Sequence, residues 1–335
     1  MVEVIKKGIE KARVGEANHA TLYVNEAELV GENEFLFFIK PEITLASEGI
    51  ALDSILTMIL GRIESCGLQI KNINVLSADY LKENNIIAQH YGVINQIASD
   101  ARLNLSEGAR KKFETLYGQT VEEAPVLGGV EFLDKYPVFN PISLDLLWQN
   151  KENQKLAGGT YAEDIKLDGE VVYVINGFHP RQLIHFTEKG RSIVVFTLKG
   201  NLAWSDARNK LIGATNPAKA EEGSIRRTLL DNKEAYGLKE VSQGSNGVHL
   251  SAGPVEGLVE LVRYNSNFTE GGQLLTSENF SYGQKLVENF TENQVKAILS
   301  NENVTFEGKT ISIFDLTEEK NSDESIAILK KVFEA

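Results

Sequence analysis

The sequence predicts an α/β (α+β) sandwich of the split βαβ kind, in which two strand–helix–strand units share one small sheet. Two observations predict it. Short apolar runs alternate with stretches of helical periodicity up to about residue 100 and again from about residue 170. Between these regions, residues 101–169 are rich in glycine- and proline-containing turns. We therefore expect a folded core that an inserted, mainly helical lobe interrupts.

The first half of the core is expected to run strand, helix, strand, helix. Residues 34–40, EFLFFIK, form a short apolar run of the kind found in buried strands. Residues 49–68 have helical apolar spacing and end at a glycine. Residues 69–77 alternate in polarity, which predicts a strand with one wet face, and residues 78–103 are again helical in pattern.

The second half resumes this alternation and is followed by a long tail. The expected elements are strands at 169–178, 192–200 and 247–251 and helices at 181–190, 204–213 and 253–265. The tail is expected to hold a helix over 281–299, a hairpin over 304–314 and a final amphipathic helix. The expected parts are an N-terminal extension 1–34, a ferredoxin-like core from 35–100 and 170–265, the insertion 101–169, and a C-terminal extension 266–335.

Composition and charge disfavour several classes of function. A net charge of −13 makes nucleic acid a poor partner, because phosphate backbones bind basic surfaces. No run approaches the roughly 18 apolar residues of a membrane span. Cys66 is the single cysteine, so no internal disulfide forms, and we expect a soluble protein of the reducing cytoplasm. His179 and His185 are six residues apart and do not share a helix face, so no zinc site is expected.

Two neighbouring stretches carry the most informative residues. GATNPAKAEEGSIRR, residues 213–227, places Thr215 and Arg226 on a loop rich in glycine and proline. SNGVHLSAGP, residues 245–254, presents His249 after a glycine-containing turn. Arginine and threonine side chains are suited to holding phosphate, and a neutral imidazole is a good nucleophile near pH 7. EGKT at 307–310 is not a P-loop, because the motif's first glycine is missing.

This ordered set of residues resembles the nucleoside-diphosphate kinase family. The resemblance covers about residues 35–95 and 175–265, and its most specific piece is LIGATNPAKAEEGSIR. It implies a nucleophilic role for His249, with Ser251 and Glu260 supporting the imidazole. Lys40 matches the family's lysine near the sugar and phosphates, and Tyr91 matches the tyrosine near the transferred phosphate. The other nucleotide-binding positions implied are Arg208, Thr215 and Arg226 for the phosphates, Asn246 for the ribose, and Phe178 or Phe186 for the base.

The chemistry of these residue types agrees with the implied roles. Phosphoryl transfer requires positioning and stabilisation of charge on the phosphoryl oxygens, which arginine forks supply. A carboxylate bonded to one imidazole nitrogen fixes the tautomer and leaves the other nitrogen to attack. Several departures from the family pattern bear on this, including a longer segment between Arg226 and Asn246 and a longer loop after Lys40. Leu250 and Ala252 stand where the family has glycine and aspartate, and one extra residue lies between Arg208 and Thr215.

The resemblance implies transfer of the γ-phosphate of an NTP to an NDP by a ping-pong mechanism through phospho-His249. ATP and other NTPs and NDPs are the expected ligands, with Mg²⁺ on the nucleotide phosphates and broad acceptance of bases. A cytoplasmic homo-oligomer is expected, with neither nucleic acid nor membrane as partner. The alternative is a catalytically weak nucleotide-binding or regulatory module on the same fold. A third interpretation is an unrelated α/β domain with a chance match.

Overall fold

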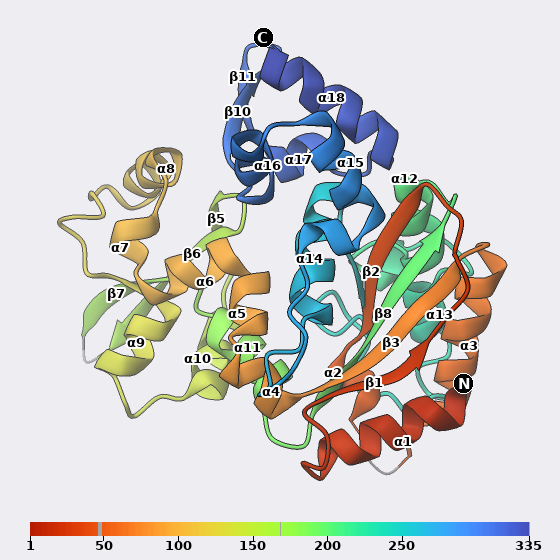
Figure 1. Cartoon of the computed structure of the whole chain (residues 1–335). Helices are drawn as coiled ribbons and strands as arrows, with labels where there is room; N and C mark the ends of the chain where they lie inside the picture. The colour runs from red at the N-terminus through yellow and green to blue at the C-terminus, as the bar shows by residue number, and fades with distance from the viewer. Residues whose placement is uncertain (46–48, 168, 335) are drawn as a thin grey trace. The chain divides into compact units, whose positions relative to one another are not determined.

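The computed structural model describes residues 1–45, 49–167 and 169–334, and residues 168 and 335 of the predicted insertion and tail lie outside it (Figure 1). The chain divides into two compact units, which are described separately. The first unit joins Met1–Tyr80 to Lys189–Ala335. The second unit is Leu81–Glu188, so it contains the predicted insertion together with flanking residues on both sides.

The first unit is built on a five-stranded antiparallel sheet. Its strands in sheet order are β1 (His19–Val24), β3 (Gln69–Ser77), β8 (Ser192–Gly200), β2 (Asn33–Ile39) and β9 (Val248–Leu250). Strands β2 and β3 are separated by β8, and β8 and β9 are separated by β2. This is the arrangement of two interleaved βαβ units, with β1 added at one edge. The predicted fold class is confirmed by this strand order.

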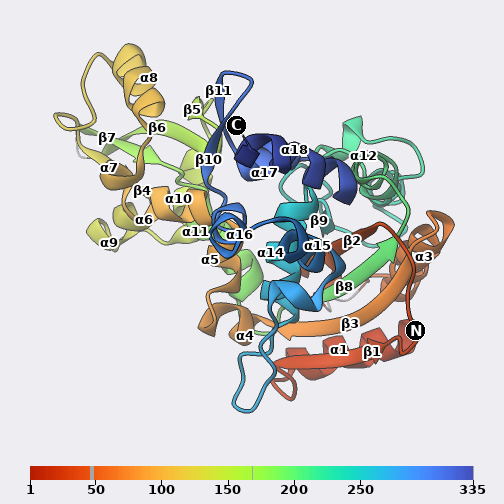
Figure 2. The same cartoon turned by 45° about the horizontal axis from the view of Figure 1, so that its top comes forward.

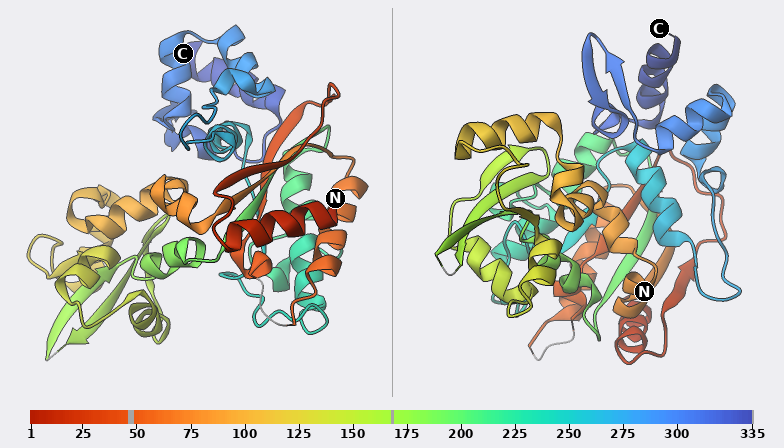
Figure 3. Two further views of the ribbon diagram at one scale, coloured as in Figure 1. Left: turned by 60° about the horizontal axis from the view of Figure 1, so that its bottom comes forward. Right: turned by 90° about the vertical axis from the view of Figure 1, so that its left-hand side faces the viewer.

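Helices cover both faces of this sheet. One face packs against α1 (Val2–Arg13), α3 (Leu52–Ser65) and α13 (Ile225–Asp231), whose apolar residues share a core cluster with the strands. Helix α14 (Pro254–Asn265) packs on the other face. In the left view of Figure 3, the red helix α1 and the blue C-terminal elements lie on opposite sides of the sheet. Adjacent residues of β2 therefore point to different helices.

The short helix expected at 204–213 has an irregular end. It begins as α12 (Trp204–Asp206) and continues as a π-helical turn, Ala207–Ile212. A π-turn holds more residues than an α-turn and occurs as a single-turn bulge. Arg208, one of the residues predicted for the site, lies in this turn.

The C-terminal extension belongs to the first unit (Figure 2). Its elements are a 3₁₀ turn at Ser277–Asn279, α15 (Ser281–Asn289), α16 (Glu292–Leu299), the hairpin β10 (Asn303–Phe306) with β11 (Lys309–Ser312), α17 (Ile313–Thr317) and α18 (Ser322–Glu334). The single helix expected over 281–299 is wrong. It is broken at Phe290 and Thr291, and the chain restarts with a capping box in which Thr291 pairs with Gln294.

The second unit has its own four-stranded sheet. Its strands in sheet order are β4 (Val126–Gly128), β7 (Glu170–Ile175), β6 (Thr160–Leu167) and β5 (Gln154–Ala157). Strand β7 was expected in the central sheet, but it pairs with β4 and β6 instead. Its apolar run predicts a strand and does not specify a partner, because strand pairing depends on the tertiary fold.

The helices of the second unit, and α4 at its boundary with the first, are shorter than the sequence pattern suggests. The helix expected over 78–103 is divided into α4 (Ala78–Glu83), α5 (Ile86–His90), α6 (Gly92–Ser99) and α7 (Ala101–Asn104). The breaks fall at Asn85, which has a positive φ of 54°, at Tyr91 and at Asp100. The remaining helices are α8 (Glu107–Tyr117), α9 (Gly129–Lys135), α10 (Pro141–Gln149) and α11 (His179–Thr187).

Candidate active site

His249 is the middle residue of β9, where it pairs with Phe38 of β2. Alternation along the strand turns Val248 and Leu250 into the core cluster and His249 toward α14. Gly247 precedes the strand with a positive φ of 79°, and a Cβ there would lie 2.4 Å from a methyl carbon of Leu229. The turn therefore requires glycine, and it delivers the His249 side chain to the face of α14 with 19% of its surface exposed.

Glu260 of α14 binds the imidazole. Its Oε2 lies 3.1 Å from Nε2 of His249 and also accepts a 2.5 Å hydrogen bond from the Ser251 hydroxyl. Glu260 is 2% exposed, and Ser251 is fully buried. A buried carboxylate with two such partners holds the ring in a fixed orientation. The structure thus brings together three residues predicted for the site, His249, Ser251 and Glu260.

A ring stack fixes the imidazole from its side. Phe38 stacks on His249 with ring centroids 4.5 Å apart and planes 21° apart. Phe38 also contacts Tyr264 of α14, with centroids 5.4 Å apart. Phe38 and Tyr264 are fully buried, so the imidazole lies at the edge of an aromatic cluster rather than in open solvent.

Two arginines hold the backbone on either side of His249. Nη2 of Arg226 donates to the carbonyl of Val248 at 3.0 Å, and Nη1 of Arg208 donates to the carbonyl of Leu250 at 3.3 Å. Arg226 also donates from Nη1 to Gly213 at 2.8 Å and is 6% exposed. Strand β9 is at the edge of its sheet, so the carbonyls on its outer side have no neighbouring strand to pair with. The two guanidinium groups donate hydrogen bonds to these carbonyls. Both predicted phosphate-binding arginines are therefore bonded to the backbone of residues adjacent to His249.

Lys40 and Asn246 form a polar pair beside this strand. Nζ of Lys40 donates to Oδ1 of Asn246 at 2.7 Å, and the Asn246 amide donates to the backbone carbonyl of Thr215 at 3.1 Å. Thr215 itself is exposed. Burial lowers the pKa of Lys40 to about 8, Glu42 opposes the shift, and nearby Arg226 adds to it. Lys40 and Arg226 together concentrate positive charge here.

Sequence reasoning missed several carboxylates around the site. Glu42 accepts from the backbone N–H of Gly247 at 2.8 Å, which secures the turn before His249. Glu256 accepts from the N–H of Ala252 at 3.0 Å. Burial, assisted by Glu260, raises the pKa of Glu256 to about 7. The four-residue spacing of two glutamates on one helix face was the available signal for Glu256.

Leu250 and Ala252 each have a local structural role. Leu250 is 1% exposed and packs in the core cluster, so its bulk lies on the face of β9 away from His249. Ala252 uses both backbone groups, its N–H toward Glu256 and its carbonyl toward the N–H of Glu319 at 2.9 Å. Two glutamates, Glu256 and Glu319, thus bind the backbone of Ala252.

Tyr91, Phe178 and Phe186 belong to the second unit, and their roles in this site stay predictions. The ring of Tyr91 lies 6.4 Å from that of Phe186 and 6.2 Å from that of His179. Phe178 packs against Trp148 at 5.8 Å between centroids. Phe186 is 3% exposed and Phe178 is half-buried in an apolar cluster, so both contribute to the packing of that unit.

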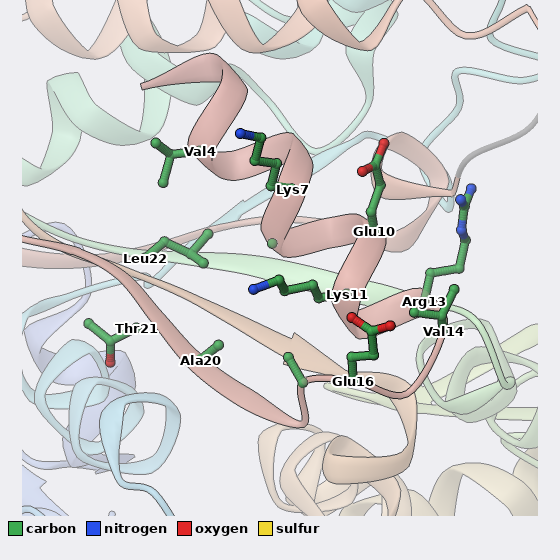
Figure 4. Close-up of a pocket in the computed structure, with 12 residues that line it drawn as sticks. Val4, Lys7, Glu10, Lys11, Arg13, Val14, Glu16, Ala20, Thr21 and Leu22 are labelled. Carbon is green, nitrogen blue, oxygen red and sulfur yellow. The ribbon is translucent and has the colours of Figure 1, made fainter.

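A separate groove lies between α1 and β1 (Figure 4). It has a volume of about 690 Å³, and none of its lining residues belongs to the predicted site. Figure 4 shows the basic side chains Lys7, Lys11 and Arg13 interspersed with Glu10 and Glu16. Because basic and acidic side chains are mixed in this groove, it favours neither anionic nor cationic ligands.

No protein-family model matches the chain. Solved structures with a detectable likeness include a nucleoside diphosphate kinase from Encephalitozoon cuniculi, with a TM-score of 0.33 and 15% identity, covering 73% of this chain and 94% of that one. A nucleoside diphosphate kinase family protein from Babesia bovis has a TM-score of 0.33 and 16% identity, covering 76% of this chain and 99% of that one. An NDP kinase from Pyrobaculum aerophilum has a TM-score of 0.32 and 17% identity, and the match covers 72% of this chain and 98% of that one. This is a distant likeness in fold, and the split βαβ assignment rests on the strand order.

Within the described residues, no helix has both the length and the apolar character needed to cross a bilayer. The mean hydropathy of the chain is −0.19.

Proposed function

We propose that this protein is a nucleoside-diphosphate kinase that transfers the γ-phosphate of an NTP to an NDP through a phosphorylated His249. The observation that carries the proposal is the buried carboxylate of Glu260, which contacts Nε2 of His249 and accepts from Ser251. A carboxylate accepts hydrogen bonds, so this contact favours the tautomer with the proton on Nε2. The lone pair then resides on Nδ1, which acts as the nucleophile.

The transfer is balanced in two half-reactions. Nδ1 of His249 attacks the γ-phosphorus, an N–P bond forms, and the bond from that phosphorus to the β–γ bridging oxygen breaks, which releases the first NDP. A terminal β-phosphate oxygen of a second NDP then attacks the same phosphorus, and the N–P bond breaks. The imidazole returns to its starting state. Glu260 stabilises the positive charge that the ring develops when Nδ1 is bonded to phosphorus.

Positive charge beside the imidazole supports binding of the phosphates. Two arginines bond to the backbone of residues adjacent to His249, Arg208 at Leu250 and Arg226 at Val248. Lys40 lies close enough to Arg226 for the two charges to interact. Charges placed before the reaction stabilise the phosphoryl oxygens without reorganising. Mg²⁺ enters on the nucleotide phosphates as part of the substrate. We further propose that the protein accepts nucleotides with purine and pyrimidine bases alike. We also propose that it is a homo-oligomer of the cytoplasm.

The test is phosphorylation of the full chain by γ-labelled ATP with Mg²⁺. We expect an acid-labile label that ADP, GDP, CDP and UDP each remove. His249→Ala is expected to lose the label while its thermal unfolding midpoint stays close to that of the unchanged protein. His185→Ala, a histidine of the other unit, is the matched control and keeps full labelling. Labelling of His249→Ala at the original rate contradicts the assigned nucleophile.

A catalytically weak nucleotide-binding or regulatory module on the same fold is the second candidate. Arg208 favours it, because this guanidinium faces Glu318 and Glu319 of the C-terminal extension, at 3.6 Å and 3.8 Å. An arginine already facing carboxylates is less available to phosphate. Binding of MgADP without any labelling by ATP would support this candidate and exclude the kinase.

A further inference from the structure

A short turn of the C-terminal extension packs against the residues that follow His249. The backbone N–H of Glu319 donates to the carbonyl of Ala252 at 2.9 Å. The carbonyl oxygen of Thr317 lies 2.6 Å from the point that a Cβ on Gly253 would occupy. Only glycine permits so close an approach of two backbones. Figures 1 and 2 show α17 and α18, which flank this turn, beside α14.

The same turn is anchored at its other end. Oδ1 of Asn321 accepts from the backbone N–H of Trp204 at 3.1 Å and from the side chain of Asn33 at 3.1 Å. Asn33 accepts in return from the N–H of Ser322 at 3.0 Å. Trp204 begins the helix that leads into the π-turn carrying Arg208. The turn is thus fixed to the segment before Arg208 and to the segment after His249.

Two carboxylates of this turn face Arg208. Oε1 of Glu318 lies 3.6 Å from Nη2, and Oε1 of Glu319 lies 3.8 Å from Nε. The glutamate side chains are 47% and 40% exposed, whereas that of Arg208 is 26% exposed. Exposed ion pairs at such distances stabilise a fold by about 0–1 kcal/mol. The buried and part-buried hydrogen bonds of Asn33 and Asn321 hold the turn in place, so the turn does not depend on the ion pairs for its stability.

We propose that Glu318 and Glu319 compete with a bound phosphate for Arg208. An incoming phosphate must displace the two carboxylates from the guanidinium group before it binds there. The inference rests on the proposed function, which identifies the anion as a nucleotide phosphate. The two carboxylates and a phosphate are anions that attract the same guanidinium group, so they compete for it. The extension thereby lowers nucleotide affinity and speeds release, without contributing a reacting group.

The electrostatics of the neighbouring helix agree with this. Glu256 is a carboxyl whose pKa is raised to about 7 by burial first, by Glu260 second and by Glu318 to a lesser extent, while Arg208 lowers it. The glutamates of the turn and of α14 therefore already disfavour added negative charge around Arg208. A phosphate arriving here meets that repulsion until Arg208 turns from the glutamates to the phosphate.

The test compares the full chain with a Glu318→Gln/Glu319→Gln variant by calorimetric titration with MgADP. We expect the dissociation constant of the variant to be about tenfold lower, equivalent to ~1.4 kcal/mol. Glu318→Asp/Glu319→Asp is expected to stay within about threefold of the unchanged protein, because the charges remain (a threefold change is ~0.7 kcal/mol). Glu302→Gln/Glu307→Gln removes two exposed charges of the same extension and serves as the matched control. Equal gains in this control and in the variant overturn the inference.

A second background separates direct competition from a general effect of charge. With Arg208→Ala, the Glu318→Gln/Glu319→Gln change is expected to alter MgADP affinity less than about twofold, because the competed group is absent. A retained tenfold gain overturns the inference. Tripolyphosphate is titrated in parallel. If MgADP binds neither protein, the proposed function fails. The titration with tripolyphosphate still tests the inference in that case. The inference is wrong if the Glu318→Gln/Glu319→Gln variant binds tripolyphosphate no more tightly than the unchanged protein, or does not bind it.

Discussion

The two faces of the five-stranded sheet bury different kinds of side chain. The face toward α1, α3 and α13 is apolar and packs residues such as Phe37, Val194 and Phe196. The face toward α14 buries polar groups, and Oδ1 of Asn265 accepts from Asn72 at 2.7 Å and Asn74 at 2.9 Å. His249 projects from this second face.

The difference indicates a division of tasks within one sheet. An apolar face gains stability in proportion to the area removed from water, and each unpaired polar atom on it costs free energy. A polar face has to satisfy each buried group, and such networks orient side chains more strictly than apolar packing does. The candidate chemistry lies on the face where orientation is specified by hydrogen bonds. Substitutions on the two faces are therefore expected to separate stability from phosphoryl transfer.

The largest expected effect comes from the neighbouring residues Phe37 and Phe38, which are both fully buried on opposite faces. Phe37→Ala and Phe38→Ala are each expected to lower the free energy of unfolding by about 3–5 kcal/mol. Only Phe38→Ala is expected to reduce labelling per folded molecule as well, because its ring stacks on His249. Urea unfolding and initial labelling rates measure the two effects. Equal labelling losses in both variants would remove the distinction between the faces.

Glu260→Gln is expected to have the next largest effect. The amide keeps the volume but removes the charge that stabilises the imidazole, so the labelling rate falls by about 100-fold. Ser251→Ala leaves the carboxylate in place and is expected to reduce the rate less. Single-turnover labelling with excess enzyme isolates the chemical step. The idea that Glu260 acts on His249 is wrong if Glu260→Gln labels as fast as the unchanged protein.

Lys40 gives a prediction for the pH dependence of anion binding. Its pKa of about 8 means that the ammonium loses its charge as pH rises through 8. Affinity for MgADP is expected to fall up to about tenfold between pH 7 and pH 9, since one cation is lost. Lys40→Met is expected to bind weakly with little change over this range. Calorimetry in buffers of different ionisation enthalpy would detect the associated proton uptake.

Glu256 is expected to show the smallest effect, on stability. Its folded pKa of about 7 lies above the ordinary value of 4.5, so the folded state holds this proton more tightly than the unfolded state. Stability from this group is present at low pH and declines as pH rises from about 4.5 to 7. Glu256→Gln is expected to lessen the decline and to gain about 1 kcal/mol at pH 8, because the amide stays neutral across this pH range. Urea unfolding at pH 5 and pH 8 measures it, and an equal decline in both proteins would contradict the assignment.

The sequence by itself determined the alternating strands and helices of the core. Its apolar runs and helical spacing suffice to place β2, α3, β3, β8 and α14, because these segments bury one face or both. The resemblance of the motif around His249 to a known family, and not the spacing of its residues, implied roles for Ser251 and Glu260. The helix breaks at Asn85, Tyr91 and Phe290 were missed, because helical periodicity continues across each interruption.

Only the tertiary structure decided which strands pair and which distant side chains come into contact. Nothing in the apolar run of β7 states that it pairs with β4 and β6, since backbone hydrogen bonds do not depend on side-chain identity. Likewise, Glu318 and Glu319 are ordinary surface glutamates in the sequence, and only folding brings them to Arg208, more than a hundred residues earlier. Spacing along the chain predicts contacts within one element, whereas contacts between distant elements follow from how their buried faces pack.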